Sequence, residues 1–416
     1  MSEEKSDRLE AYPTGRMIAS LAHEAHNTGC TKGSGCGRSR CVLFRGSKVM
    51  RKVWTVAGLL VLGLFVATSQ GAHKWGLKEG SPEMKSAGHL AAGPEGILFI
   101  GDAKGAQIVA IDTGDAKGEP AKAKYDIANL NETLSAAVGG SKVTINDLIV
   151  NPASGNLFVS VAKADGTPGL VKIDSSGKAS EVSLTKAWFQ KLALPNAPED
   201  KEVVGKNGRT QNNRPNAITD LAYADGKVLV SGVTSEAAPS NIREITFPFA
   251  EADQGTAVEI FHGAHGKLED YAAIRAFVPF NVDGQASVLA GFTCTPLVRF
   301  SVNELESNKG KKVRGTTVAE LGNRNQPLDI VLYEKGGEKF LLIANNNRGV
   351  MKVSTKDIGR KEGITEPVKG GGVAGQTYDT IKELEGTVQL DKLGDSQAVV
   401  VIKSGDALAL KTVALP

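Results

Sequence analysis

The sequence is poor in aromatic residues and has almost no cysteine in its main part. Only 5% of its 416 residues are aromatic, whereas 48 are glycine. This balance is typical of a chain with many tight turns between short strands, and it argues against long amphipathic helices. Cys294 is the single cysteine that follows residue 41. The sequence therefore predicts an all-β protein whose main part has no internal disulfide.

A strong charge of one sign is also lacking. The chain has 49 basic and 46 acidic residues, and its basic residues do not gather into a run that could follow phosphates. The sequence contains no GxSxG, HExxH, Walker or CxxCH motif and no strand–GxGxxG–helix unit. We therefore expect no nucleic-acid partner, and the enzyme classes that carry those motifs have no support.

The first 49 residues show no apolar periodicity, and they include a stretch rich in glycine, cysteine and arginine. Such a composition cannot bury a core, so residues 1–49 are predicted to be disordered or a mis-called extension. Cys30, Cys36 and Cys41 lack the paired spacing of a zinc site. Metal binding there is the minor alternative.

Residues 50–72 have the order of a secretory signal. A basic start at 50–52 is followed by an apolar run of 15 residues at 53–67 and then by small residues. The simplest interpretation is that translation begins at Met50. The alternative is an uncleaved signal anchor, although 15 residues are short of the ~20 that span a bilayer. Either interpretation predicts that residues 73–416 are exported, to the periplasm or the cell exterior, and contact a membrane only through this segment.

One unit recurs from residue 73 onward. A polar residue precedes a short apolar strand, a Gly, Asp or Asn turn, a strongly apolar strand and a third strand, which is the order of a propeller blade. The clearest copies lie at 146–161, 219–233 and 328–344, and weaker copies begin at residues 89, 275 and 389. This predicts about six blades of four strands. The 73-residue spacing after Asp147 leaves a seventh blade open.

The longest spacing also contains two local features. Residues 193–215 hold several prolines and lack apolar alternation, so we expect a surface excursion there. Residues 184–194 just before it are predicted to form a short helix.

The Asp-Leu pairs at Asp147-Leu148 and Asp220-Leu221 stand at the same distance from their turns. In this arrangement the chain resembles the six-bladed propeller superfamily of NHL-repeat and YVTN-type proteins, over roughly residues 85–416. The resemblance implies a single propeller domain over 73–416. The sequence departs from WD40 and kelch repeats, and its few tryptophans disfavour the docked blades of quinoprotein dehydrogenases.

The residue at the same point of each unit is expected to line the central channel. These residues are His89, Asp147, Asp220, Arg275, Asp329 and Gln389. Three carboxylates suit a divalent cation such as Ca²⁺, so Asp147, Asp220 and Asp329 are candidate metal ligands. Arg275 would meet an anionic ligand or neutralise the carboxylates. The competing interpretation is that each Asp accepts hydrogen bonds from backbone amides of a neighbouring blade.

Three further positions could contact a ligand. His262 and His265 are spaced to reach one metal ion, but the glycines beside them favour a flexible surface loop. Asn345 and Arg348 are expected in a turn between two strands. Cys294 lies in an apolar strand pattern, where a thiol behaves as a small hydrophobe.

These features favour a binding or scaffolding module for a protein, a glycan or a small ligand, monomeric and without a cofactor. The alternative is a divalent-metal-dependent hydrolase of the lactonase type, which would use the three aspartates with His89 and would require an ion such as Ca²⁺.

Overall fold

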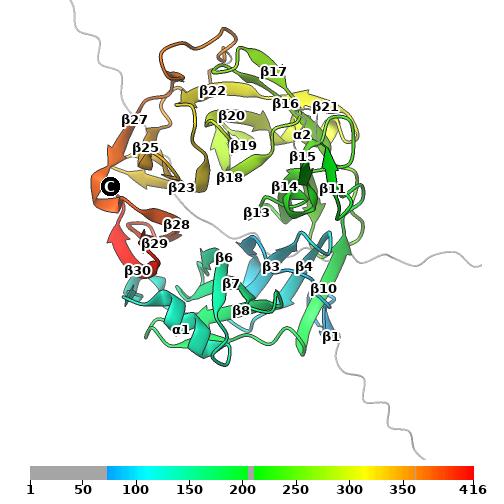
Figure 1. Cartoon of the computed structure of the whole chain (residues 1–416), viewed down its shortest axis with the longest axis vertical. Helices are drawn as coiled ribbons and strands as arrows, with labels where there is room; N and C mark the ends of the chain where they lie inside the picture. Colours follow the sequence, from blue (N-terminus) through cyan, green and yellow to red (C-terminus); the bar gives the residue numbers. More distant parts are fainter. Residues whose placement is uncertain (1–72, 205–209, 361) are drawn as a thin grey trace, which may run out of the picture. The chain divides into compact units, whose positions relative to one another are not determined.

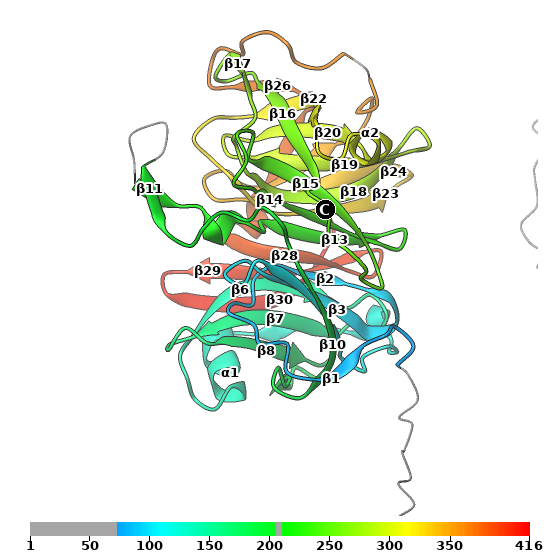
Figure 2. The same ribbon diagram turned by 90° about the vertical axis from the view of Figure 1, so that its right-hand side faces the viewer.

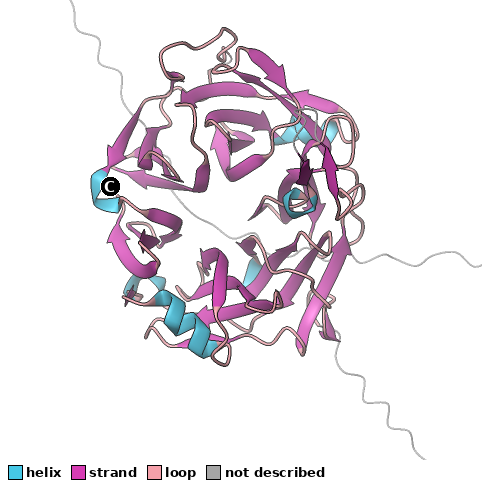
Figure 3. Cartoon of the chain, in the orientation of Figure 1, coloured by secondary structure: helices cyan, strands magenta, loops and turns pink. Residues whose placement is uncertain are grey.

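The computed structural model describes residues 73–204, 210–360 and 362–416, and strands dominate them (Figures 1 and 3). Six sheets, antiparallel apart from one parallel strand pair, stand around a central axis as blades, so the predicted all-β six-bladed propeller is confirmed. The predictions for the extension at 1–49 and the signal segment at 50–72 lie outside the described residues. No helix in the described ranges is long and apolar enough to cross a membrane.

We number the blades by the sequence order of their inner strands. From the axis outward, blade 1 holds β2 (Leu90–Ala92), β3 (Ile97–Asp102), β4 (Gln107–Asp112), β10 (Ala187–Ala193) and β1 (Lys78–Gly80). Blade 2 holds β6 (Val143–Val150), β7 (Leu157–Lys163), β8 (Pro168–Ile173) and β9 (Ala179–Glu181). Blade 3 holds β13 (Asp220–Ala224), β14 (Lys227–Val233), β15 (Ser240–Thr246) and β16 (Thr256–His262), with β17 (Lys267–Glu269) and the parallel strand β21 (Lys312–Arg314) paired to β16.

Blade 4 holds β18 (Ile274–Val282), β19 (Gln285–Phe292), β20 (Pro296–Ser301), β22 (Thr316–Leu321) and β26 (Val373–Gly375). Blade 5 holds β23 (Pro327–Lys335), β24 (Glu338–Asn345), β25 (Gly349–Ser354) and β27 (Tyr378–Ile381). Blade 6 holds β28 (Thr387–Leu393), β29 (Gln397–Ser404), β30 (Ala407–Ala414) and β5 (Asp126–Ile127). The helices are α1 (Leu130–Ala137), α2 (Val302–Ser307) and the single turns Pro94–Gly96, Pro120–Lys122, Arg214–Asn216 and Lys382–Leu384.

The second strand of each blade is its most apolar because adjacent blades cover both of its faces. In blade 2, Phe158 packs with the core shared with blade 1, whereas Val159 packs with the core shared with blade 6. Each fully buried Val, Leu or Phe contributes about 1.5–3 kcal/mol. This two-sided burial explains why the sequence shows one continuous apolar run in each unit.

The blades do not follow one another in sequence order. The inner strand of blade 1, β2, packs beside β6 of blade 2 on one side and β13 of blade 3 on the other, and β28 of blade 6 packs beside β6 (Figure 1). The order around the axis is therefore 2-1-3-4-5-6. After β4 the chain supplies β5 to blade 6, builds blade 2, and returns to add β10 to blade 1 before it enters blade 3.

The predicted helix at 184–194 is wrong, because Ala187–Ala193 forms strand β10. This segment pairs with β4 over six residues and with β1 on its other side. Its Ala, Gln, Lys and Leu residues favour a helix locally, but pairing with the exposed edge of blade 1 overrides that preference.

The described residues of the long spacing, 147–204 and 210–220, form no seventh blade. Besides β10 it holds a small hairpin of β11 (Glu202–Val204) and β12 (Thr210–Asn212). The side chains of β11 are exposed, and Figure 2 shows this hairpin projecting from the blades. The predicted surface excursion at 193–215 is confirmed for its described residues, 193–204 and 210–215.

The connection from β4 to β5 passes blade 2, where Asp115 fastens it. The buried Asp115 carboxylate accepts hydrogen bonds from Asn151 Nδ2, Ser154 Oγ, Asn156 Nδ2 and Lys172 Nζ, the last at 2.7 Å. Burial alone would raise the pKa of Asp115, but these bonds, led by that from Lys172, hold it below its usual value. A charged carboxylate thus anchors the crossing segment.

Candidate functional site: an axial pocket

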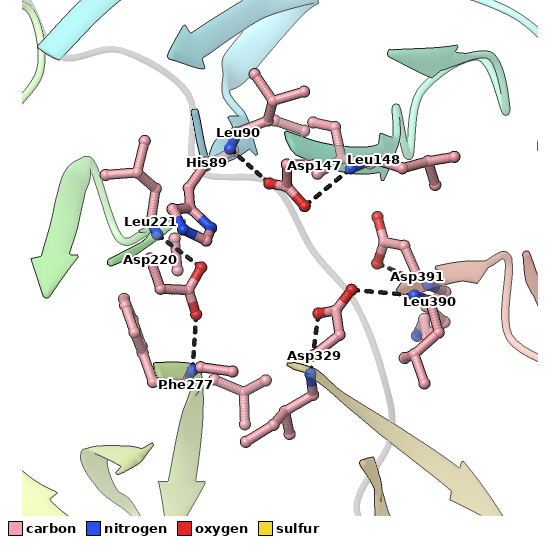
Figure 4. A pocket seen from close by; sticks show the side chains of 18 of the residues that line it. His89, Leu90, Asp147, Leu148, Asp220, Leu221, Phe277, Asp329, Leu390 and Asp391 are labelled. Atoms are coloured by element: carbon pink, nitrogen blue, oxygen red, sulfur yellow. Dashed lines mark hydrogen bonds between the residues drawn. The ribbon is translucent and has the colours of Figure 1, made fainter. Parts of the chain in front are cut away.

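The inner strands of the six blades surround a cavity of about 300 Å³ at the axis (Figure 4). Its ionisable lining residues are His89, Asp147, Asp220, Tyr223, Arg275, Asp329, Asp391 and Lys392. The structure therefore brings together five of the six residues that the repeat pattern placed on the axis. Gln389 does not line the cavity, and blade 6 contributes Asp391 instead.

Three aspartates join neighbouring blades through backbone amides, as Figure 4 shows. One carboxylate oxygen of each accepts from the amide of the next residue, and the other accepts from an amide of the adjacent blade. The pairs are Asp147 with Leu148 and Leu90 (2.8 and 2.7 Å), Asp220 with Leu221 and Phe277 (2.8 and 2.7 Å), and Asp329 with Ile330 and Leu390 (2.9 and 3.0 Å).

These bonds follow an alternating pattern around the axis. The aspartates belong to blades 2, 3 and 5, and their second oxygens reach blades 1, 4 and 6. In blades 1, 4 and 6, the residue equivalent to the aspartate comes directly before the residue whose amide donates. This equivalent residue is His89, Ala276 or Gln389. The expectation that each Asp accepts amide hydrogen bonds from a neighbouring blade is therefore confirmed.

Arg275 lines the pocket but lies one residue before the equivalent position in blade 4. A β-bulge between Ile274 and Ala276 removes it from the strand pairing. Its guanidinium donates to Asn216 Oδ1 and Thr293 Oγ1, both at 3.2 Å. Bulges at the same point precede Asp147, Asp329 and Gln389, so the equivalent residue in blade 4 is Ala276.

Asp391 is a site residue that the sequence did not indicate. It bridges blade 6 to blade 2, because its oxygens accept from the amides of Lys392 at 2.6 Å and Val150 at 2.7 Å. It comes two residues after Gln389, the position selected from the repeat. The usable signal was an Asp on the same face of the inner strand, one pleat further on.

Negative charge is strongly disfavoured in this pocket. Burial raises the pKa of Asp147, Asp220 and Asp329 well above the usual value, and repulsion among the carboxylates adds to the effect. Burial likewise raises the pKa of Asp391 to about 6. Burial, assisted by the charge of Arg275, lowers the pKa of His89 to about 4, which leaves that imidazole neutral at pH 7.

The predicted metal ligands do not meet the spacing of direct coordination. Among the described residues, the group of three whose ligand atoms all lie within 4.8 Å of one another is His262, His265 and Cys294, away from the axial aspartates. The three aspartates could therefore not all bind one ion directly in this arrangement. Calcium binding by Asp147, Asp220 and Asp329 stays a prediction.

The secondary candidates lie elsewhere. Asn345 and Arg348 flank the predicted turn, where Asn345 Oδ1 accepts from the amide of Arg348 at 3.2 Å. The surface-loop prediction is wrong for His262, which ends β16 and is buried, whereas His265 follows in a turn and is exposed. Cys294 lies in the turn between β19 and β20, so its predicted place within a strand is wrong.

No family model matches this chain, and no curated protein matches it. Similar solved structures include a chain of the Mitotic Checkpoint Complex, 9% identical, with TM-score 0.32 and 87% of this chain and 99% of that one covered. The PQQ-bound aldose sugar dehydrogenase of Streptomyces coelicolor is 12% identical (TM-score 0.26; 81% and 97% covered), as is streptogramin B lyase (TM-score 0.27; 82% and 97% covered). The six-bladed assignment rests on the sheet topology above.

Proposed function

We propose that this chain is an exported, non-catalytic binding module whose axial pocket takes a small, positively charged ligand. The observation that carries the proposal is the set of four carboxylates around one cavity, against two cationic side chains, Arg275 and Lys392. Each of these carboxylates has a pKa raised by burial. A cation in the cavity would offset the cost of ionising them.

The geometry favours binding over the hydrolase alternative. In Asp147, Asp220 and Asp329 both oxygens already accept backbone amides. Amide hydrogen bonds stabilise the ionised carboxylate, so they weaken each of these groups as a general base that would take a proton from water. Calcium-dependent hydrolysis of a lactone that is lost in Asp147→Asn would contradict the non-catalytic proposal.

Calorimetric titration of the chelator-treated full chain tests ligand binding, with calcium chloride and 1,4-diaminobutane as probes. Arg275→Gln removes a positive charge from the lining, so we expect it to tighten binding of a cationic probe roughly three- to tenfold. Asp391→Asn should weaken binding by a similar factor. Asp406→Asn changes an exposed carboxylate outside the lining and should have no effect. If neither probe binds, or if Arg275→Gln leaves the affinity unchanged, the proposal is wrong.

Export is supported by the signal-like order of residues 50–72. Cell fractionation followed by N-terminal sequencing tests it. We expect the protein outside the cytoplasm, with a new N-terminus shortly after the apolar run or, for an uncleaved anchor, in the membrane fraction. Recovery from the cytoplasm with Met1 or Met50 intact would contradict export.

A further inference from the structure

Two imidazoles and one thiol meet where blades 3 and 4 adjoin. His262 ends β16, His265 lies in the turn to β17, and Cys294 lies in the turn between β19 and β20. One nitrogen of each ring and the Cys294 sulfur all lie within 4.8 Å of one another. The two ring centroids are 3.7 Å apart. Three potential ligands from two blades therefore converge on one point.

Glu269 at the end of β17 holds both imidazoles. Its Oε2 contacts His262 Nδ1 at 2.9 Å, its Oε1 contacts His265 Nδ1 at 2.7 Å, and the Tyr271 hydroxyl donates to Oε1 at 3.0 Å. A carboxylate on one ring nitrogen orients a histidine whose other nitrogen binds metal.

The free nitrogen of His262 lacks a partner. The His262 side chain is 2% exposed, and its buried Nε2 makes no hydrogen bond within the described part of the chain. Leaving such an atom unpaired costs on the order of 1–3 kcal/mol. A ligand at this nitrogen would remove that cost.

The backbone around the three side chains is closely fixed. The Gly263 amide donates to Glu320 Oε1, and an added Cβ at Gly263 would approach Val368 to 2.8 Å. The Cys294 amide donates to the Asn325 carbonyl at 2.7 Å, which helps to hold Cys294 at a φ of 65°. These contacts keep the thiol facing the histidines instead of releasing it into a loose loop.

We propose that His262, His265 and Cys294 bind one transition-metal ion of the zinc class, with Glu269 positioning both rings. Two imidazoles and a thiolate are borderline-to-soft donors that zinc prefers, and a fourth position would stay open for water. Zinc bonds of about 2.0–2.3 Å place tetrahedral ligand atoms roughly 3.3–3.7 Å apart. His265, 44% exposed, can make the remaining small movement.

Cobalt titration of the full chain tests the proposal, because a thiolate ligand gives cobalt a charge-transfer absorption band. Cys30, Cys36 and Cys41 are changed to serine in every sample, which leaves Cys294 as the single thiol. We expect a thiolate band that saturates at one cobalt per chain and disappears when zinc is added. Cys294→Ser should abolish the band, and His265→Asn should weaken binding at least tenfold.

Glu269→Gln tests the positioning role, and we expect it to weaken cobalt binding by roughly 10–100-fold while the band remains. His73→Asn is the matched control, because His73 also pairs with a carboxylate, Asp112, but belongs to another part of the fold. It should bind cobalt as the parent does. Absence of the band in the parent, or an equal band in Cys294→Ser, would overturn the proposal. Because His265 is exposed, its variant still tests the site if Cys294→Ser does not fold.

Discussion

Asp147 shows how one short side chain joins two blades. Its two oxygens satisfy the amides of Leu148 and Leu90, which would otherwise be buried donors at the axis. Asparagine offers one acceptor oxygen and turns a donor toward the second amide. We therefore expect Asp147→Asn to lower the free energy of unfolding by about 1–3 kcal/mol, measured by urea denaturation. Asp406→Asn, at an exposed position, is the control, and equal stability of the two variants would show that the bridge contributes nothing.

Asp391 predicts a dependence of stability on pH. Its folded pKa of about 6 lies above the usual value of 3.8, so the folded state binds its proton more tightly. The stabilisation of the folded state that comes from this tighter proton binding is complete below about pH 4 and is lost as pH rises through about 6. The free energy of unfolding of the wild type, minus that of Asp391→Asn, should therefore fall by roughly 1–3 kcal/mol between pH 4 and 7. Without added cations, a constant difference would contradict the raised pKa.

At the scale of single residues, the sequence predicted the pocket residues correctly where one residue type recurs at the same position of several repeats. Asp147, Asp220 and Asp329 stand before their turns in the same way, and all three reached the pocket. The sequence was misleading in blade 4, where Arg275 precedes the equivalent position by one residue, and in blade 6, where the carboxylate belongs to Asp391, one pleat beyond Gln389.

Among the elements, the β4–β5 connection depends most on one side chain. Asp115→Ala would leave the donors of Ser154, Asn156 and Lys172 without their acceptor. We expect a loss of roughly 2–5 kcal/mol in thermal or urea unfolding at neutral pH. Because the folded pKa of Asp115 is lowered, this contribution is present above the usual pKa and disappears as pH falls through the folded value. A deficit that persists unchanged in acid would mean that packing, not charge, is responsible.

Strands that complete another blade were the elements that the sequence could not reveal. The inner three strands of each blade lie close together in the chain, so their turns and apolar runs are local signals. β10 carries helix-favouring residues and acquires its conformation from β4, about 80 residues earlier. Pairing at that distance leaves no local pattern.

At the scale of the molecule, the ring closes where β30 meets β5. The Thr412 amide donates to the Tyr125 carbonyl, so the next pair, Asp126 and Lys411, is a non-hydrogen-bonded pair with closely spaced Cα atoms. Both side chains are exposed. We expect Asp126→Cys with Lys411→Cys, in a background with the four native cysteines changed to serine, to form a disulfide that stabilises the oxidised protein by about 2–5 kcal/mol.

The reduced form of the same variant is the control for this disulfide. Its melting temperature should match that of the cysteine-free background, whereas the oxidised form should melt higher. Failure to form the disulfide in the folded protein would contradict the pairing of β5 with β30.

The sequence predicted the number of blades but not their order. All six units share one pattern, and nothing in that pattern states which blade packs against which. Blade 1 lies between blades 2 and 3 because β2 fits between β6 and β13, which is a property of assembled faces and not of any single unit.

Blade 6 is completed by β5, a strand from a distant part of the chain, and this separation affects folding during synthesis. Tyr125 leaves the ribosome 287 residues before its partner Thr412, and synthesis at about 5–20 residues per second makes that interval roughly 15–60 s. During that time the strand that will close the ring has nothing to pair with. β5 is only two residues long, and Asp126 is exposed, which are features that keep a waiting strand edge from pairing with other chains.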